Sequence, residues 1–354
     1  MYECILVTGG AGFVGSTLAM ALAKSGAAKR VIAFDNLKRR GSELNVPRLK
    51  SAGVEFSHGD VRSFGDLSEH TPDLMIECSA EPSAQAGYGG SPEYLIHTNL
   101  LGCYNCLELA RRKKADFFFV STSRVYPHRR LNSLSFAEEE TRFSLTPTQV
   151  LPGASEFGIS EDFPLNGARS LYGMTKLSAE LMVEEYGDAY GLRTVINRCG
   201  LLTGPWQMGK SDQGVIALWV AAHYFRRNLQ YIGFGGTGKQ VRDFLHVDDF
   251  VDLVFLQMKD IDRFNGRLFN VGGGAKNSLS LLECTTVCEE ITGNRIEIAP
   301  VVENRPADLR SYLTDSRRIN ELCGWSPKRD ARATLGDIHS WIRAEEASLK
   351  SVLD

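Results

Sequence analysis

A tyrosine and a lysine lie four residues apart near the middle of the chain, in the segment S-L-Y-G-M-T-K. Residues at this spacing share one face of a helix. An ammonium group at Lys176 would favour the ionised form of the Tyr172 phenol, which could then accept a proton near neutral pH. The pair therefore predicts proton transfer with a substrate.

Three hydroxyl side chains follow an apolar, strand-like segment upstream of this pair. The segment A-D-F-F-F-V is followed by Ser121, Thr122 and Ser123. Open parallel sheets bind ligands beyond the carboxyl ends of their strands, so a hydroxyl here can meet a substrate. Alone, such a cluster is typical of a strand-end cap. Together with Tyr172 and Lys176 it forms a hydroxyl, phenol and ammonium set.

A glycine-rich segment near the N-terminus predicts a dinucleotide site. The sequence V-T-G-G-A-G-F-V-G places Gly9, Gly12 and Gly15 in G-x-x-G-x-x-G spacing, between an apolar strand and a helix that starts near Phe13. Glycines let the backbone approach a pyrophosphate, whose charge is stabilised by the N–H groups of the helix N-terminus. We expect Phe13 and Val14 to belong to the same site.

An acidic residue ends the second strand-like segment, R-V-I-A-F-D. Asp35 lies about 20 residues after the last glycine, where a carboxylate accepts the ribose hydroxyls of NAD and repels the 2′-phosphate of NADP. Asn36 is expected beside it. The carboxylate favours NAD over NADP, and the basic run 38–40 weakens this preference. Asp60 and Val61 follow a third strand and are expected near the adenine.

The chain alternates strand and helix patterns, which predicts an α/β fold with a Rossmann-type doubly wound parallel sheet. We expect a first domain over residues 1–198 and a smaller C-terminal α/β substrate-binding lobe over 199–354, with segments that return to the first domain. Residues 127–170 are rich in Pro and Gly and predict a long loop that covers the substrate, with a solvated insertion as the alternative. The expected strands are 3–8, 30–35, 54–57, 73–78, 116–122 and 193–198, and the expected helices include 13–26, 98–114 and 171–191.

Composition excludes several other classes of protein. The 354 residues include 40 basic and 43 acidic side chains, and a net charge of −3 gives no general attraction to nucleic acid or to a membrane. The N-terminus lacks a signal-peptide pattern, and the eight cysteines are scattered, so we expect a cytoplasmic protein. Cys103 and Cys106 form a C-x-x-C within a helical pattern, which predicts burial rather than a redox or metal site.

At this point the sequence resembles the extended short-chain dehydrogenase/reductases, in particular the NAD-dependent epimerases and dehydratases of nucleotide sugars. Besides the glycine and Y-x-x-x-K motifs, the similar stretches include G-K-Q-V-R-D-F-L-H-V-D-D (238–249), F-N-V-G-G (269–273) and R-P-A-D-L-R (305–310). Three further stretches, F-D-N-L-K-R-R-G (34–41), S-D-Q-G (211–214) and N-S-L-S-L-L-E (277–283), are most similar to a branch that epimerises a CDP-linked sugar at C2.

The resemblance implies roles for particular residues. It implies a catalytic triad of Thr122, Tyr172 and Lys176, bound NAD, a nucleoside-diphosphate sugar as substrate, and a homodimer formed through the helices at 98–114 and 171–191. Guanidinium groups bind phosphate in bidentate fashion, so arginines of the second half are expected at the diphosphate. The resemblance adds to the cofactor site Ser79, Ala80 and Asn99. The residues expected at the substrate are Glu81, Ser123, Arg124, Arg198, Gln213, Gln240, Arg242, Arg305 and Asp308.

Two departures from the family pattern bear on the reaction. Glu81 stands where relatives usually have an amide or a small residue, and Arg124 is a bulky cation. The 4,6-dehydratases carry an Asp-Glu pair directly after the catalytic Thr, whereas this chain has Ser123 and Arg124. Water elimination would therefore lack its paired acid and base.

We expect an NAD-dependent epimerase that oxidises its sugar transiently to a ketone. A nucleotide-sugar 4-epimerase and a dehydrogenase or reductase with net redox remain alternatives. A 4,6-dehydratase and a non-catalytic NAD-binding regulator are further alternatives. We expect no metal.

Overall fold

A seven-stranded sheet organises the first of two units into which the chain divides. The computed structural model describes residues 1–210 and 213–353. Unit 1 comprises Met1–Thr122, Leu171–Arg198 and Val251–Leu268, and unit 2 comprises Ser123–Ser170, Cys199–Phe250 and Phe269–Asp354. Residues 123–170, which we placed in the first domain, thus group with unit 2.

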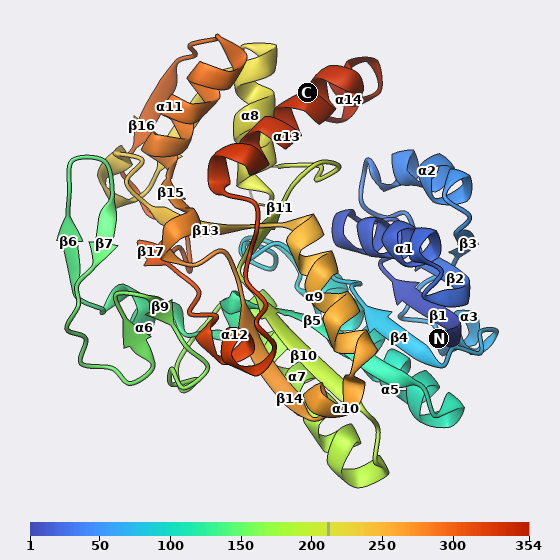
Figure 1. The fold of residues 1–354 in the computed structure, drawn as a ribbon. Coiled ribbons are helices and arrows are strands. Elements are labelled where there is room, and N and C mark those ends of the chain that lie inside the picture. Colours follow the sequence, from blue (N-terminus) through green and yellow to red (C-terminus); the bar gives the residue numbers. More distant parts are fainter. Residues whose placement is uncertain (211–212, 354) are drawn as a thin grey trace. The chain divides into compact units, whose positions relative to one another are not determined.

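The sheet has the strand order β14-β10-β5-β4-β1-β2-β3 (Figure 1). The pairs β1–β2, β1–β4, β2–β3 and β4–β5 are parallel. This order confirms the predicted Rossmann-type doubly wound sheet. The strands are β1 (Tyr2–Thr8), β2 (Ala28–Asp35), β3 (Glu55–His58), β4 (Leu74–Glu77), β5 (Asp116–Thr122), β10 (Thr194–Cys199) and β14 (Arg267–Val271).

Strands of this sheet are apolar on both faces because helices of the same unit pack on it. Residues 4–8 of β1 and all of β4 are buried, as expected for a covered parallel sheet. Helices α1 and α5 contact the sheet through β2 and β4, and α7 contacts β5. The helices are α1 (Phe13–Ser25), α2 (Asn45–Ser51), α3 (Phe64–Ser68), α4 (Glu93–Ile96), α5 (Gly102–Lys113), α7 (Leu171–Tyr190), α9 (Val247–Lys259, which begins in unit 2) and α10 (Ile261–Phe264), with single turns η1 (Ser42–Leu44) and η2 (His97–Leu101).

Unit 2 combines short sheets with three packed helices. Strand β13 pairs with β11, β15 and β17, and β12 pairs with β16. Helices α8, α11 and α13 contact one another and lie together in Figure 1. The strands are β11 (Leu201–Thr203), β12 (Leu229–Ile232), β13 (Val241–His246), β15 (Ser278–Ser280), β16 (Ile298–Val301) and β17 (Ser311–Tyr312). The helices are α8 (Val215–Phe225), α11 (Leu281–Thr292), α12 (Arg317–Cys323), α13 (Ala331–Ala344) and α14 (Glu346–Leu353), with turns η3 (Ser123–Val125), η4 (Phe234–Gly236) and η5 (Ala275–Asn277).

The predicted loop over 127–170 contains regular elements of its own. It holds α6 (His128–Asn132), β6 (Phe136–Glu138), β7 (Phe143–Leu145), β8 (Ala154–Ser155) and β9 (Gly158–Ile159), with β6–β7 and β8–β9 paired as antiparallel strands. Periodicity could not reveal strands of two or three residues, because such strands are too short to show an alternating pattern.

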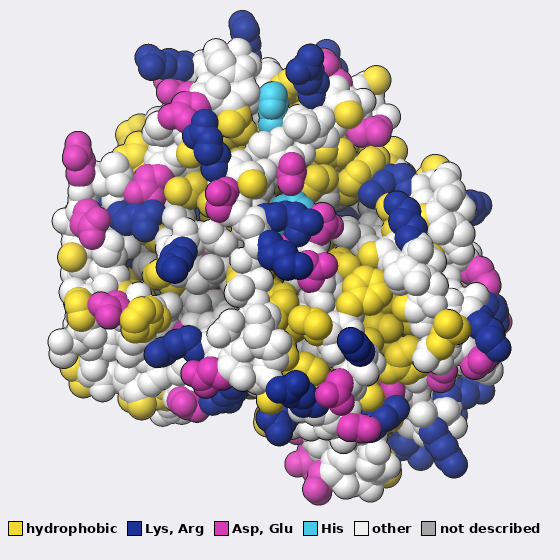
Figure 2. Space-filling view, viewed as in Figure 1, with side chains coloured by type: hydrophobic (Ala, Val, Ile, Leu, Met, Phe, Trp, Pro, Cys, Tyr) yellow, Lys and Arg dark blue, Asp and Glu magenta, His cyan; other side chains and the backbone are white. Residues whose placement is uncertain are grey.

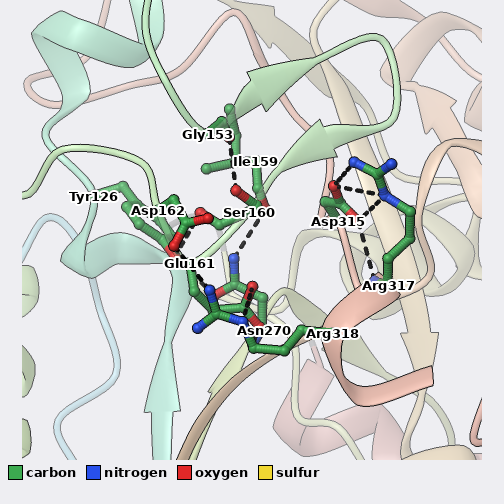
Figure 3. A network of polar contacts seen from close by, with 10 residues as sticks. All are labelled: Tyr126, Gly153, Ile159, Ser160, Glu161, Asp162, Asn270, Asp315, Arg317 and Arg318. Atoms are coloured by element: carbon green, nitrogen blue, oxygen red, sulfur yellow. Dashed lines mark hydrogen bonds and ion pairs between the residues drawn. The ribbon is translucent and has the colours of Figure 1, made fainter. Parts of the chain in front are cut away.

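Polar contacts fix this segment within unit 2 (Figure 3). The Tyr126 hydroxyl donates to Asn270 Oδ1 at 2.8 Å, and the Asn270 backbone N–H donates to Glu161 Oε1 at 2.7 Å. Ile159 exchanges backbone hydrogen bonds with residues 313 and 315 at 2.8 and 3.0 Å. The segment is therefore built into unit 2 by contacts with residues more than a hundred positions away.

Two further predictions concern the cysteines and membrane spans. Cys103 and Cys106 lie in α5 and are buried in the core of unit 1, so the predicted burial of the C-x-x-C is confirmed. In the part of the chain that the structure describes, every helix is too short or too polar to cross a membrane.

Candidate functional site

Tyr172 and Lys176 lie in the first two turns of α7, one helical turn apart. Both side chains belong to residues that are at least nine-tenths buried. The Tyr172 ring packs with Ala84 and Leu95. Burial on a rigid helix limits the rotamers of both side chains, as a proton-transfer pair requires.

Lys176 lies against two residues of the sheet that sequence reasoning missed. Its Nζ is 3.7 Å from Glu77 Oε2, at the end of β4, and 3.9 Å from the centre of the Phe119 ring on β5. Phe119 and Glu77 are opposite each other in the β4–β5 register. The lysine therefore has a carboxylate and an aromatic face as neighbours, both of which attract a cation.

Thr122 ends β5 and is nine-tenths buried, at the edge where parallel sheets bind ligands. The preceding hydroxyl has a structural partner, because Ser121 Oγ donates to Glu180 Oε1. Arg198, expected at the substrate, donates from Nη2 to Glu180 Oε2 at 2.7 Å and from Nε to both carboxylate oxygens at 3.0 Å. A contact of Arg198 with substrate stays a prediction.

The glycine turn has the tight geometry that a dinucleotide needs. Gly9 has φ +62°, and a Cβ there would lie 2.8 Å from the backbone of Cys78 and Ser79. A Cβ at Gly15 would overlap the carbonyl oxygen of Gly9. Gly12 begins α1 without a side-chain cap, and the first turn of α1, which includes Phe13 and Val14, contains no acidic residue. This N-terminus therefore fits a bound pyrophosphate.

Asp35 lies directly against this turn. Its Oδ2 accepts the Ala11 N–H at 3.0 Å, and its Oδ1 accepts the Leu37 N–H at 2.8 Å. Burial raises the pKa of Asp35, and these backbone donors oppose that effect. Each carboxylate oxygen has a second lone pair, so the same group can still accept a ribose hydroxyl.

The adjacent residues of the predicted cofactor site form a second cluster. Asn36 Nδ2 donates to Asp60 Oδ2 at 2.9 Å, and Arg62 forms an ion pair with the same carboxylate at 2.7 Å. Partial burial raises the pKa of Asp60, but the hydrogen bonds from Arg62 and Asn36 outweigh it and bring the pKa to about 2. Val61 lies next in the chain, and its carbonyl accepts the Asn105 amide at 2.8 Å.

The segment after β4 is fastened by Asn99. Its Oδ1 accepts the Glu81 N–H at 2.8 Å, and its Nδ2 donates to the Thr175 hydroxyl on α7 at 3.1 Å. Ser79 Oγ donates to Glu77 Oε1, and Ala80 lies between Ser79 and Glu81. Asn99 thus connects the expected cofactor residues after β4 to the helix that carries Tyr172 and Lys176.

In unit 2 two predicted arginines lie near each other. Arg242 donates to the carbonyls of Val241 and Leu309 and contacts Asp308 Oδ1 at 3.3 Å. Arg124 donates to the Ala307 carbonyl at 3.1 Å. Burial first, and then the charge of Arg124, lowers the pKa of Arg242 to about 10. Two guanidinium groups this close are suited to an anion with two or more charges.

The remaining predicted substrate residues are spread over unit 2. Gln240 donates to the Ile232 carbonyl at 2.7 Å, while its buried Oε1 has no hydrogen-bond partner. Arg305 begins the turn that contains Ala307, and the Ser123 carbonyl accepts the Tyr126 N–H. Gln213 exchanges backbone hydrogen bonds with Lys210, but Ser211 and Asp212 of the S-D-Q-G stretch lie outside the described residues.

Acidic and basic side chains are interspersed on the face shown in Figure 2. Within residues 1–210 and 213–353 no three His, Cys, Asp or Glu side chains are arranged to hold a metal ion.

The residues that sequence reasoning missed are Glu77 and Phe119. An acid at the end of the apolar segment L-M-I-E was the available signal for Glu77.

Comparison with known proteins places the chain in a family. The model of the NAD dependent epimerase/dehydratase family matches residues 5–272. The chain belongs to this family. NAD is therefore its cofactor, as predicted, and the glycine turn and Asp35 are the parts of unit 1 that fit it.

Individual relatives catalyse different reactions. The chain is 30% identical over 348 residues to CDP-paratose 2-epimerase of Salmonella typhi, a match that covers 95% of this chain and 98% of the relative. It is 27% identical over 355 residues to dTDP-glucose 4,6-dehydratase of Mycolicibacterium smegmatis, covering 99% and 96%.

Solved structures of this family have the same fold. UDP-glucose 4-epimerase from Thermotoga maritima, solved with UDP-glucose, matches with a TM-score of 0.76 and 25% identity, covering 97% of this chain and all of that chain. UDP-glucose 4-epimerase from Thermus thermophilus, solved with NAD, gives the same TM-score and identity, covering 96% and 99%.

Proposed function

We propose that this family member is an NAD-dependent epimerase of a nucleoside-diphosphate sugar, of the CDP-paratose 2-epimerase type. The observation that carries the proposal is the buried Tyr172–Lys176 pair on α7, in the same unit as Thr122 and the glycine turn. The match to a curated 2-epimerase over nearly the whole chain supports this reaction type.

The chemistry balances without net redox. Tyr172, as phenolate, removes the proton of a sugar hydroxyl while a hydride leaves the same carbon, so the carbon becomes a ketone. NAD, held by the glycine turn and Asp35, would supply the acceptor and donor of that hydride. When the ketone has presented its opposite face, the carbon regains hydride with inverted configuration and Tyr172 returns the proton to oxygen.

Lys176 and Thr122 support this proton transfer in the proposal. The ammonium of Lys176 stabilises the phenolate of Tyr172 from one helical turn away. The Thr122 hydroxyl orients the sugar hydroxyl at the end of β5. Lys176 and Thr122 act through charge and a hydrogen bond, and Tyr172 returns the proton that it took, so none of the three is consumed during turnover.

The arginine pair of unit 2 supports a diphosphate-bearing substrate. Arg124 and Arg242 carry charges close enough to affect each other, and burial strengthens their attraction to an anion. A diphosphate would relieve this repulsion by supplying negative charge. Proton NMR with different nucleotide sugars would identify the epimerised carbon and the nucleobase of the substrate.

A dehydratase is the less favoured reading because the chain lacks the side chains for it. Ser123 and Arg124 follow Thr122, so neither position offers a carboxyl group to move a proton during water elimination. A 4-epimerase is the second candidate, because the fold matches UDP-glucose 4-epimerases over nearly the whole chain.

Proton NMR of the purified protein with CDP-, UDP-, GDP- and dTDP-linked sugars tests the proposal. We expect inversion at one ring carbon without consumption of NAD, and the ring proton whose coupling changes identifies C2 or C4. The Tyr172→Phe variant should lose turnover while it still binds NAD. Stoichiometric NADH accumulation would contradict an epimerase and favour a dehydrogenase.

A further inference from the structure

Glu77 is a buried carboxyl group in the sheet of unit 1. It ends β4 and is 1% exposed. In the sheet it lies opposite Thr8 of β1 and Phe119 of β5. An isolated carboxylate in such a place is strongly disfavoured, so its persistence calls for a compensating charge.

The contacts of Glu77 are divided between its two oxygens. Oε1 accepts the Ser79 hydroxyl. Oε2 is buried, has no hydrogen-bond partner, and lies 3.7 Å from Lys176 Nζ. The side chains of this ion pair are both at most 3% exposed, so solvent screens their attraction little.

Two thiols lie close enough to Glu77 to be affected by its charge. Cys103 and Cys106 of α5 face it, and burial first, and then the charge of Glu77, raises their pKa values well above the usual range. They are neutral at working pH. Burial raises the pKa of Glu77 itself, and Lys176 is the leading opposing influence, followed by Ser79.

We propose that Glu77 is a positioning residue whose carboxylate is the counter-ion of Lys176 and thereby sets the pH range in which Tyr172 works as a base. This inference rests on the proposed function, because it needs Tyr172 to exchange a proton with substrate. Glu77 acts through Lys176 and touches no reacting atom.

Two opposing consequences of the counter-ion fix the sign of its effect. Glu77 supplies the negative charge that faces the buried Lys176 ammonium at 3.7 Å, so loss of that charge should reduce activity at high pH. It also offsets part of the ammonium charge that Tyr172 senses, which makes the phenolate form at a higher pH. Removing the carboxylate charge should therefore move both limbs of the pH profile to lower pH.

The Glu77→Gln variant tests the proposal with an almost unchanged side-chain shape. We expect both limbs of its kcat/KM profile to move to lower pH by about one unit, which is a tenfold change in each protonation equilibrium. Glu77→Asp keeps the charge and should retain most of the wild-type profile. Cys106→Ala alters the same core without changing its charge and should leave both limbs in place.

A second readout needs no turnover. Ultraviolet difference titration of wild-type and Glu77→Gln proteins, each against its Tyr172→Phe counterpart, reports phenolate formation at Tyr172 alone. We expect phenolate at lower pH in Glu77→Gln. If no sugar is converted but this shift is seen, the proposed function fails, while the effect of Glu77 on phenolate formation at Tyr172 is still supported.

Carbon-13 NMR of the Glu77 carboxyl in the wild-type protein, assigned by comparison with Glu77→Asp, covers the case in which Glu77→Gln does not fold. An ionised carboxyl at neutral pH supports the counter-ion role. A protonated carboxyl at neutral pH, an unshifted Glu77→Gln profile, or an equal shift in Cys106→Ala would overturn it.

Discussion

At the residue scale, the chemistry of this protein depends on charges that burial makes expensive. Lys176, Glu77 and Arg242 are all charged groups with little exposed surface. Such groups persist in proteins when a partner or a ligand compensates them. Lys176 has Glu77 as its partner, whereas Arg242 has both a carboxylate, Asp308, and a second cation, Arg124, beside it. We therefore expect the first group to serve proton transfer and the second to serve anion binding.

Substitution of Arg124 tests the anion-binding role. In Arg124→Ala the KM for the nucleotide sugar should rise about tenfold to a hundredfold, because one charge-assisted phosphate contact is worth about 1.5–3 kcal/mol. The kcat and the affinity for NAD should change little. Steady-state kinetics and isothermal titration with NAD measure these quantities.

Arg295→Ala is the matched control, since the Arg295 side chain is 88% exposed. Its KM should equal that of the wild type. A fall in kcat with unchanged KM in Arg124→Ala would show instead that Arg124 acts on the chemical step.

At the element scale, β1, the glycine turn and α1 together form the part of unit 1 that fits NAD. Gly15 permits α1 to approach the turn, because a Cβ there would overlap the Gly9 carbonyl. Gly15→Ala should weaken NAD binding more than tenfold and destabilise the protein by about 1–3 kcal/mol, since the backbone must shift. Titration calorimetry and urea unfolding measure the two effects.

Gly336→Ala is the control for this substitution. Gly336 lies inside α13, and a Cβ there would meet no atom within 4 Å. Alanine should stabilise the helix by up to about 1 kcal/mol and leave NAD binding unchanged. Equal effects at both glycines would contradict the close-approach argument.

Another element-scale link joins α5 to α7. Glu108 on α5 accepts hydrogen bonds from Arg111 at 2.9 Å and from the Tyr186 hydroxyl on α7 at 2.8 Å. The Arg111 hydrogen bond, and then that of Tyr186, outweigh partial burial and bring the pKa of Glu108 to about 2. Because the folded value lies below the usual 4.5, this stabilisation is present above that value and is lost as pH falls toward about 2.

Thermal unfolding as a function of pH tests this link. As the pH falls from neutral toward about 2, the unfolding temperature of the wild type should fall more than that of Glu108→Gln. The two curves of unfolding temperature against pH should therefore converge. Glu185→Gln, at an exposed position on α7, should run parallel to the wild type. Parallel curves for Glu108→Gln would contradict the assignment.

At the scale of the whole molecule, each unit is assembled from three separate segments of chain. Residues 251–268 belong to unit 1, after the chain has built part of unit 2. In such a topology most stabilising contacts are distant in sequence. Because NAD should bind only the folded form of unit 1, we expect it to raise the unfolding temperature of that unit first.

The expected homodimer can be tested at exposed apolar residues of η2, α5 and α7. Leu101, Tyr104 and Leu181 are 40%, 44% and 55% exposed, and α5 and α7 contact each other. Leu181→Glu should shift the protein toward monomer, because a charge in an apolar interface is costly. Sedimentation at several concentrations measures this, with Val150→Glu, 92% exposed in unit 2, as control. A monomeric wild type would refute the dimer.

The sequence by itself determined the sheet, the glycine turn, Asp35 and the Tyr172–Lys176 pair, because these depend on local period, fixed spacing and backbone geometry. Only the tertiary structure revealed Glu77 beside Lys176 and the strands within 127–170. Both arise from contacts between segments far apart in the chain, Glu77 with Lys176 and Ile159 with Leu313. Spacing along a sequence does not predict which distant side chains will be buried together. Such pairs are therefore seen only in the packed arrangement of the sheet and its helices.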